Sequence, residues 1–387
     1  MADREPGPPA TVAPETGAPR APRAAPAARP SGVIAVDAMS GDLGPAAVIA
    51  GLAKSARRIP DIRFIVHGDE AQLLRLIRRR IGLSERCEVR HAPEVVPMDA
   101  KPSRVLRRAK GTSMQGALAS VASGEASVAV SCGNTGALMA MAMFTLRRAP
   151  GVDRPAIAVF WPSRGPKGHN IVLDVGADIR ADPHNLVQFA VMGAEYARIG
   201  LGLSRPRVGL LNVGTEEAKG GEELHRAAQL IAAAAVRPGA GFSYVGFVEG
   251  GDILSDRVDV IVTDGFTGNI ALKTAEGVAS FISESLREAF RHTWLSRLGA
   301  LFAATSLLRL KKKIDPRRVN GGVFLGLNGS VVKSHGGADS TGIAAAVRLA
   351  ATMGQSGFEA RVAEQVANAV AGHDTRPPEQ TMGTPRE

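Results

Sequence analysis

The sequence predicts an α/β protein in which a mostly parallel sheet is covered by helices on both faces. Short runs rich in β-branched residues alternate with helical patterns along most of the 387 residues. Many of these runs end in Gly, Asp or Asn directly before the next helical pattern. Strands that are connected through helices pair in parallel, because the crossover returns the chain to the same edge of the sheet.

Nine runs are predicted as strands and five patterns as helices, in chain order. The strands are Val33–Val36, Phe64–His67, Cys87–His91, Ser127–Ser131, Ala156–Phe160, Ile171–Asp174, Val208–Asn212, Tyr244–Phe247 and Val258–Thr263. The helices are Pro45–Arg57, Ala71–Arg80, Thr135–Leu146, Pro183–Ile199 and Glu222–Val236. A further β-like run, Ser330–Val332, precedes another long helical pattern.

The two ends of the chain differ from this central part. Residues 1–31 hold 8 of the 24 prolines together with many alanines, and residues 373–387 have a similar composition. Such segments bury too little apolar surface to fold, so we expect disordered tails around one α/β domain over residues 32–372. The first residues carry acids and prolines in place of an apolar signal core, so we expect a cytoplasmic protein.

Polar and glycine-rich loops follow five of the predicted strands. In an open α/β sheet, ligands bind at the carboxyl ends of the strands, so we expect these loops to form one composite site. The loops are Asp37–Asp42, Gly133–Gly136, Asp174–Asp178, Asn212–Glu217 and Asp264–Asn269.

Several function classes lack support in the sequence. Aromatic residues make up only 4% of the chain, which argues against stacking platforms for single-stranded nucleic acid, and no nucleic-acid partner is expected. Cys87, Cys132 and the eight scattered histidines show no metal-ligand spacing, so no metal site is expected. The Walker, dinucleotide-binding, zinc-hydrolase and serine-esterase patterns are absent.

Four side chains are candidates for the site, and each has a plain structural alternative. Asn134 could line an anion site at a helix start or simply cap that helix. Lys219 precedes a helix beside a glycine pair, which suits phosphate, although a lone lysine there is often a solvated charge. Asn269 could bind a phosphate or thioester oxygen or act as a cap. His335 could be a general acid or a structural hydrogen-bonding group.

The segment Ser283–Arg318 has a different composition, with nine basic and three acidic residues. Four of its apolar residues share one helical face: Trp294, Leu298, Leu301 and Phe302. Its basic flank includes Lys311, Lys312 and Lys313. A helix with an apolar face and a basic flank suits an anionic membrane surface, and the alternative is a helix packed on a dimer partner.

Taken together, the loops resemble the bacterial phosphate:acyl-carrier-protein acyltransferases of the PlsX type. The matching strings, in the family's order, are Ile34–Asp42, Gly133–Met139, Arg154–Ala156, Leu173–Ala177, Gly209–Glu217, Thr263–Asn269 and Val332–Gly336. They run through the whole central part of the chain. Asp178 and Gly221 stand where the family usually has Asn, which leaves the hydrogen bonding at these two positions open.

The resemblance implies a fold, a reaction and a set of partners. The fold is a Rossmann-like, doubly wound sheet similar to phosphotransacetylases and isopropylmalate dehydrogenases, in a homodimer. The reaction moves a long acyl chain from acyl carrier protein to inorganic phosphate, and the acyl phosphate passes to a membrane glycerol-3-phosphate acyltransferase. The protein would attach peripherally to the inner face of the cell membrane through a helical protrusion that looks like residues 281–318.

This interpretation needs no cofactor, because a phosphate oxygen can attack a thioester directly. Lys219 would anchor the phosphate, and Asn269 would bind phosphate or the thioester oxygen. Asp264 would orient these groups, and His335 would protonate the leaving thiolate. The expected substrate-binding set comprises Gly133, Asn134, Thr135, Gly136, Asp37, Asp174, Gly214 and Gly268.

Acyl carrier protein is acidic as a class, so we also expect a basic docking face. The candidates are Arg78, Arg79, Arg80, Arg107, Arg108 and Lys110. Two other functions stay open at this point. One is a phosphotransacetylase-like enzyme that uses acyl-CoA, and the other is a non-catalytic, membrane-docked scaffold for lipid enzymes.

Overall fold

The computed structural model describes residues 32–165, 167–216, 218–307, 309 and 321–370. The expected tails at residues 1–31 and 373–387 and the lysines Lys311, Lys312 and Lys313 lie outside these ranges. In the described part, eleven strands form one sheet in the order β3-β2-β1-β4-β11-β10-β5-β6-β9-β7-β8. Seven of its ten strand pairings are parallel, which confirms the predicted mostly parallel α/β fold.

The strands are close to those that the sequence predicts, with β10 as the addition. They are β1 (Val33–Asp37), β2 (Arg63–Gly68), β3 (Cys87–His91), β4 (Val128–Ser131), β5 (Ala156–Pro162), β6 (His169–Leu173), β7 (Arg207–Leu211), β8 (Ser243–Val248), β9 (Val260–Val262), β10 (Gly322–Leu325) and β11 (Ser330–Lys333). The helices are α1 (Gly44–Ala56), α2 (Glu70–Arg78), α3 (Pro102–Val105), α4 (Ser113–Ala122), α5 (Thr135–Thr145), α6 (Pro183–Gly200), α7 (Glu222–Ala235), α8 (Gly265–Arg291), α9 (Trp294–Phe302), α11 (Ser340–Gly354) and α12 (Phe358–Val370).

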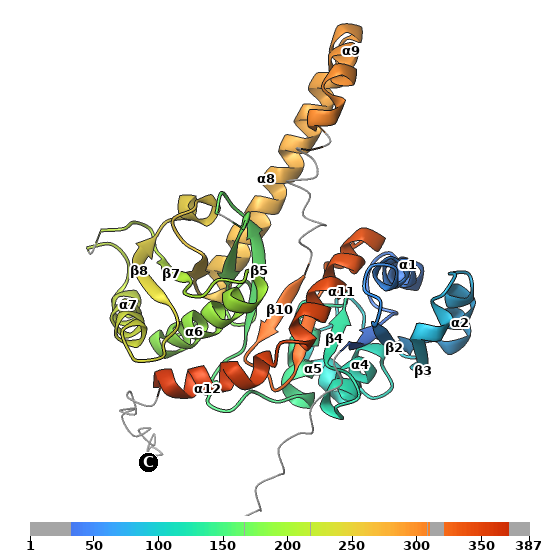
Figure 1. The fold of residues 1–387 in the computed structure, drawn as a ribbon, viewed down its shortest axis with the longest axis horizontal. Helices are drawn as coiled ribbons and strands as arrows, with labels where there is room; N and C mark the ends of the chain where they lie inside the picture. Colours follow the sequence, from blue (N-terminus) through green and yellow to red (C-terminus); the bar gives the residue numbers. More distant parts are fainter. Residues whose placement is uncertain (1–31, 166, 217, 308, 310–320, 371–387) are drawn as a thin grey trace, which may run out of the picture.

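The sheet has two halves whose parallel strands run in opposite directions. β10 is antiparallel to both β11 and β5, and β5 is antiparallel to β6. One half carries β1–β4 with α1, α2, α4, α5 and α11, and the other carries β6–β9 with α6 and α7 (Figure 1). The opposite directions of the two halves result from these three antiparallel pairings, which no local sequence pattern predicts.

The strand register places the carboxyl ends of the two halves at one level of the sheet. Lys333, the last residue of β11, pairs with Gly322, which pairs with Val159, which in turn pairs with Val172 near the end of β6. The strands of one half therefore reach this level from one side, and the strands of the other half reach it from the opposite side. Loops from both halves can contribute to one central region, despite the reversal of direction.

Side chains alternate between two apolar cores, one on each face of the sheet. Ile34 and Val36 belong to the core under α1, α6, α7, α11 and α12, whereas Ala35 belongs to the core under α4 and α5. This alternation follows from the two-residue period of a strand. Burial on both faces requires near-continuous apolar strands, which is the pattern seen in the sequence.

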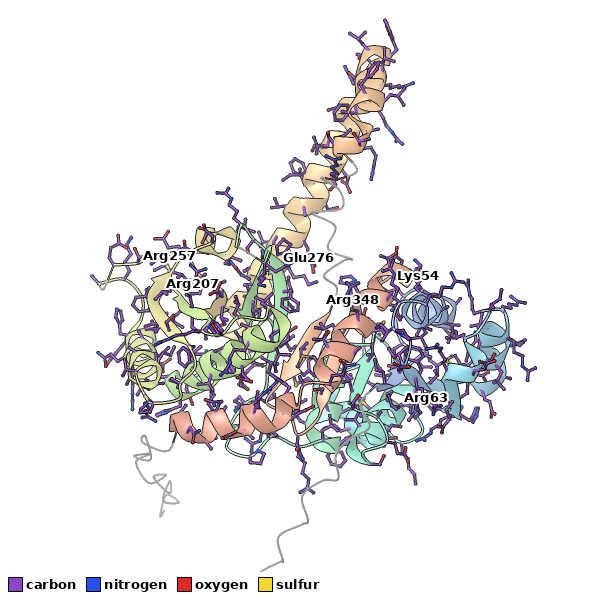
Figure 2. All side chains as sticks on the ribbon, viewed as in Figure 1. Lys54, Arg63, Arg207, Arg257, Glu276 and Arg348 are labelled. Carbon is purple, nitrogen blue, oxygen red and sulfur yellow. The ribbon has the colours of Figure 1, made fainter. Side chains whose placement is uncertain are left out.

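The long helix α8 leaves the body and carries α9 at its tip (Figure 1). Its 27 residues span about 40 Å at the usual helical rise. Gly265 and Gly268 at its start are buried, and side chains further along it project away from the body (Figure 2). The helix α8 begins within the body at Gly265, its side chains are all exposed from Ser280 to Ala289, and a break at His292–Thr293 separates it from α9.

No helix among the described residues combines the length and the apolar character that a membrane span requires.

Candidate functional site

The loops that follow β1, β4 and β11 form a first group around Asp37. The Asp37 side chain is 1% exposed and accepts hydrogen bonds from Ser113 Oγ at 2.6 Å and Ser131 Oγ at 2.7 Å. It therefore ties β1 to β4 and α4. A carboxylate so occupied positions the surrounding loops rather than binding an anion itself.

Close backbone contacts hold the same three loops together. The Asp42 N–H donates to the Gly336 carbonyl at 2.9 Å, and the Ser334 N–H donates to the Ser131 carbonyl at 2.9 Å. Gly41 has a φ of 105°, and a Cβ there would lie 2.9 Å from the Cys132 Cβ. A larger residue at position 41 would be strained and would push the loops apart.

Asn134 caps the helix α5, which is the structural role that the sequence left open for it. Its Oδ1 accepts from the Ala137 N–H at 2.8 Å, and its Nδ2 donates to the Met98 carbonyl at 2.5 Å. The exposed residues Thr135 and Gly136 begin the helix, where backbone N–H groups lack helical partners. The start of α5 can offer these N–H groups, in place of the Asn134 amide, to an anion.

Lys333 is a member of this group that we did not select from the sequence. It ends β11, is partly buried, and donates a hydrogen bond to the Ser334 carbonyl. Burial lowers the pKa of its ammonium group, and the positive charge of Lys273 on α8 acts in the same direction. Asp37 and Asp42 are near enough to oppose this shift. A cation enclosed in this way is suited to an anionic substrate.

His335 and Cys132 occupy different surroundings in the same group. His335 is exposed, and its Nδ1 accepts from the Gly337 N–H at 3.1 Å, so in the neutral ring Nε2 carries the proton. Cys132 is buried, and burial raises the pKa of its thiol to about 11. The Cys132 thiol is thus protonated at neutral pH and is a poor nucleophile.

The loops that follow β6 and β9 form a second group around Asp174. The Asp174 side chain is fully buried and accepts from the backbone N–H groups of Ile157, Gly176, Ala177 and Asp178 at 2.8–3.1 Å. Burial raises the pKa of this carboxyl, while the four N–H groups oppose the shift. Like Asp37, it shapes its loop instead of facing a ligand.

The start of α8 packs directly on this loop. A Cβ at Gly268 would clash with the Asp174 carbonyl, and one at Gly265 would clash with its carboxylate. Asp264 caps the helix, accepting from the Thr267 N–H at 2.9 Å and from its hydroxyl at 2.7 Å. Glycine at positions 265 and 268 thus brings α8 against the loop.

Asn269 lies one turn into α8, on its exposed side. A Cβ built on Gly176 would be 3.6 Å from its Cγ, so the amide lies next to the Asp174 loop. Among the residues that the structure describes, the Asn269 side chain has no hydrogen-bond partner. Its carbonyl oxygen and its amide N–H groups are available to a ligand.

Lys219 lies in a third loop, after β7. Its Nζ forms an ion pair with Glu216 Oε1 at 3.0 Å, and its side chain is 50% exposed. The Glu216 carboxylate, with Glu249 further away, raises the pKa of the Lys219 ammonium. Both side chains pack over Gly214, where a Cβ would clash with the Lys219 stem.

Comparisons with known proteins were made with this geometry in hand. A family model described as fatty acid synthesis protein matches residues 33–361. Phosphate acyltransferases from Jannaschia sp. (strain CCS1) and Paracoccus denitrificans (strain Pd 1222) are both 63% identical to the chain. Each alignment covers 88% of this chain, and 92% and 91% of the respective relative. The chain therefore belongs to the family of these phosphate acyltransferases.

Solved structures give the same fold at low identity. The EutD phosphotransacetylase from Staphylococcus aureus matches with a TM-score of 0.55 and 18% identity, covering 84% of this chain and 95% of that one. A phosphotransacetylase from Streptococcus pyogenes matches with a TM-score of 0.56 and 16% identity, covering 84% and 94%. The predicted phosphotransacetylase-like architecture is thus confirmed.

In this member of the family, the predicted site residues lie in two groups of loops and in the separate Lys219 loop. The first and second groups are linked through α8, because Lys273 is near enough to Lys333 to influence its ionisation. No hydrogen bond or ion pair joins the Lys219 loop to either group within the described ranges. Within the described ranges, no group of three or more His, Cys, Asp or Glu residues is placed so that it could hold a metal ion.

Proposed function

We propose that the protein transfers a long-chain acyl group from acyl carrier protein to inorganic phosphate. The observation that carries this proposal is the 63% identity to phosphate acyltransferases over 88% of the chain. The acyl phosphate then serves a membrane glycerol-3-phosphate acyltransferase in phospholipid synthesis.

In the proposed reaction, a phosphate oxygen attacks the carbonyl carbon of the thioester. The C–S bond breaks, the acyl group remains on phosphate, and the thiolate of the carrier leaves and takes up a proton. Phosphate is already anionic, so the protein's task is to hold two anionic partners together and to stabilise the oxyanion of the transition state. Cations and N–H donors in an enclosed site meet that requirement.

We assign the phosphate position to the region between Lys333 and the start of α5. The partly buried Lys333 ammonium and the N–H groups of Thr135 and Gly136 favour an anion there. Lys219 is the second cationic contact and is released from Glu216 when phosphate binds. Asn269 would hydrogen-bond the thioester oxygen, while Asp264 holds the first turn of α8. His335 Nε2 would protonate the leaving thiolate.

We place the membrane contact and a dimer contact on different parts of the protrusion. Trp294, Leu301 and Phe302 on α9 are 75%, 71% and 82% exposed, and Leu298 is 44% exposed. Apolar side chains in this number at a helix tip suit shallow insertion into a bilayer surface. On α8, Val278, Ile282 and Leu286 recur every four residues and are exposed, which suits a second copy of the chain.

The test is a search by mass spectrometry for acyl phosphate after the protein is mixed with phosphate and an acyl-carrier-protein thioester. We expect acyl phosphate with the carrier donor and a lower rate with acyl-CoA. Preference for acyl-CoA would support the phosphotransacetylase-like alternative. Absence of acyl phosphate with either donor, together with vesicle binding, would support the scaffold alternative.

The membrane contact has its own test, flotation with anionic vesicles. A Leu298→Glu/Leu301→Glu variant should lose flotation and keep its activity on soluble substrates. The control Ser296→Glu/Ala300→Glu carries the same charge on the opposite face of α9 and should still float. Equal flotation of both variants would show that α9 does not insert.

A further inference from the structure

We propose that a small pocket beside α5 is the docking point of the acidic carrier protein. In this arrangement an apolar side chain of the carrier fills the pocket, and carboxylates around it meet Arg107 and Lys110. The inference rests on the proposed function, because it names where that donor binds. The sequence offers two groups of basic residues as a docking face, Arg78–Arg80 and the group around Arg107, and the inference assigns docking to the second.

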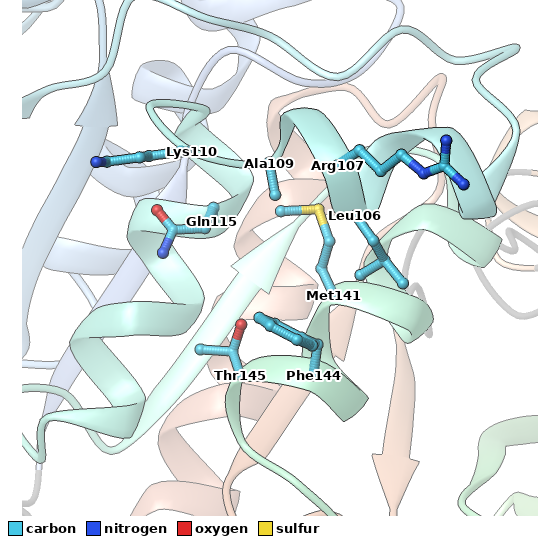
Figure 3. A pocket seen from close by; sticks show the side chains of 8 residues that line it. All are labelled: Leu106, Arg107, Ala109, Lys110, Gln115, Met141, Phe144 and Thr145. Atoms are coloured by element: carbon cyan, nitrogen blue, oxygen red, sulfur yellow. The ribbon is translucent and has the colours of Figure 1, made fainter. Parts of the chain in front are cut away.

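The pocket has a volume of about 190 Å³ and lies between α5 and the segment 106–115. Its lining includes Arg107, Lys110, Met141 and Phe144 (Figure 3). Met141 is 1% exposed and forms the inner wall, whereas Phe144 is 76% exposed at the mouth. An exposed aromatic ring beside a buried thioether is a favourable receptor for one apolar side chain.

Two cations flank this apolar centre. Arg107 and Lys110 extend to opposite sides of it in Figure 3. They belong to a short basic segment, since residues 98–110 contain five basic residues and one acidic residue. The side chain of Arg108 lies outside the described part of the chain.

The described basic side chains of this segment form no ion pair with another described residue. Lys101, Arg104, Arg107 and Lys110 are exposed, and none has an ion-pair partner among the described residues. Elsewhere several cations are paired, such as Arg207 with Asp259 at 3.0 Å. Unpaired cations around an apolar pocket complement a partner that presents carboxylates around an apolar residue.

The pocket is built on the same elements as the first group of loops. Asn134 caps α5 and donates to Met98, and Pro102 lies against Gly136 at the start of the helix. Met141 lies seven residues after Asn134, which is about 10 Å along the helix. A carrier docked at the pocket would hold its flexible thioester arm beside the proposed phosphate position.

The experiment compares two pairs of charge reversals. Arg107→Glu/Lys110→Glu alters the pocket, and Arg78→Glu/Arg79→Glu makes the same change of charge at the end of α2. Binding of carrier protein is measured by titration calorimetry at several salt concentrations. Turnover is measured with acyl-carrier-protein and with a neutral acyl-pantetheine thioester.

We expect the pocket pair to weaken carrier binding and kcat/KM about tenfold or more and to flatten their salt dependence. The α2 pair should stay within about twofold of the wild type. A Phe144→Ala variant should weaken carrier binding without a change in salt dependence, because it removes apolar contact alone. Turnover of the pantetheine donor should be unchanged in all three.

Three results would overturn the inference. These are unchanged carrier binding in the pocket pair, equal losses in both pairs, and a loss of anionic-vesicle binding in place of carrier binding. Failure of the wild type to form acyl phosphate from any donor would instead count against the proposed function. Even then, the calorimetric comparison of carrier binding would still test the docking surface.

Discussion

Asp174 and Lys219 both follow strands of the same half of the sheet, but their surroundings are opposite. Asp174 is fully buried, and four backbone N–H groups occupy its carboxylate. Lys219 is half exposed, and one exposed carboxylate is its ion-pair partner. The comparison separates residues that build the loops from residues that can exchange their partner for a substrate. Lys333 lies between these extremes, since it is charged and partly buried.

The largest effect is expected for Asp174→Ala. The substitution leaves four N–H groups without their acceptor inside the protein, and we expect a loss of about 3 kcal/mol or more in the free energy of unfolding. The matched control is Asp264→Ala, which removes a helix cap and should cost about 1 kcal/mol. Denaturant unfolding measures both, and similar values for the two variants would show that Asp174 is an ordinary cap.

The next effect concerns Lys333→Met, which keeps the length of the side chain and removes the charge. We expect kcat/KM for phosphate to fall about 100-fold, as for the loss of one charge-stabilising donor. The fold should persist, which circular dichroism can verify. Lys54→Met is the control, because Lys54 is exposed and its ammonium group bonds to the Ser340 and Thr341 hydroxyls at the start of α11. Equal activities in the two variants would remove Lys333 from the site.

The lowered pKa of Lys333 also predicts a pH dependence of stability. Its ammonium is disfavoured in the folded state relative to the unfolded state, so protonation of the folded protein carries a cost. The cost is present while the lysine is charged and disappears as the pH rises through the folded and then the unfolded pKa. Relative to Lys333→Met, the wild type should therefore gain stability as the pH rises toward the ordinary lysine pKa of about 10.4, and the gain should begin below that pH. A difference that stays constant over this range would contradict the assignment.

Lys219→Ala is expected to have a smaller effect, and on catalysis alone. Loss of a cationic contact should raise the KM for phosphate about tenfold. The free energy of unfolding should be essentially unchanged, because the Lys219–Glu216 pair is exposed to solvent. Phosphate kinetics identical to those of the wild type would show that the Lys219 loop does not reach the substrate.

Local patterns were sufficient for most strands, because short β-branched runs between turn residues are buried on both faces. They failed for β10, which begins at the second of two consecutive glycines and whose four residues have no flanking helix pattern of their own. They also missed α4, whose residues are mostly small. The opposite direction of the two halves depends on antiparallel pairings across long stretches of chain, which composition does not encode.

The site shows the same division between local and long-range information. Lys219, Asn269 and His335 could be selected because each stands in a loop after a strand. Sequence alone could not show that Asp37 and Asp174 are saturated by hydrogen bonds, since their donors come from Ser113, Ser131 and backbone groups. Nor could it show that Lys333 is partly buried and lies near enough to Lys273 of α8 for the two charges to interact.

The smallest expected effect, and the sharpest test of the contrast, is Glu216→Gln. The substitution removes the negative charge that holds Lys219 Nζ at 3.0 Å and keeps the size of the side chain. If Lys219 exchanges Glu216 for phosphate, the variant no longer has to break this ion pair, and the KM for phosphate should fall about twofold to fivefold at low salt. The advantage should vanish at high salt, where an exposed pair is screened. In the double variant Glu216→Gln/Lys219→Ala, the KM should equal that of Lys219→Ala, because the carboxylate acts only through the lysine. A lower KM in the double variant than in Lys219→Ala would mean that Glu216 repels phosphate directly, and the proposed exchange of partners would be wrong.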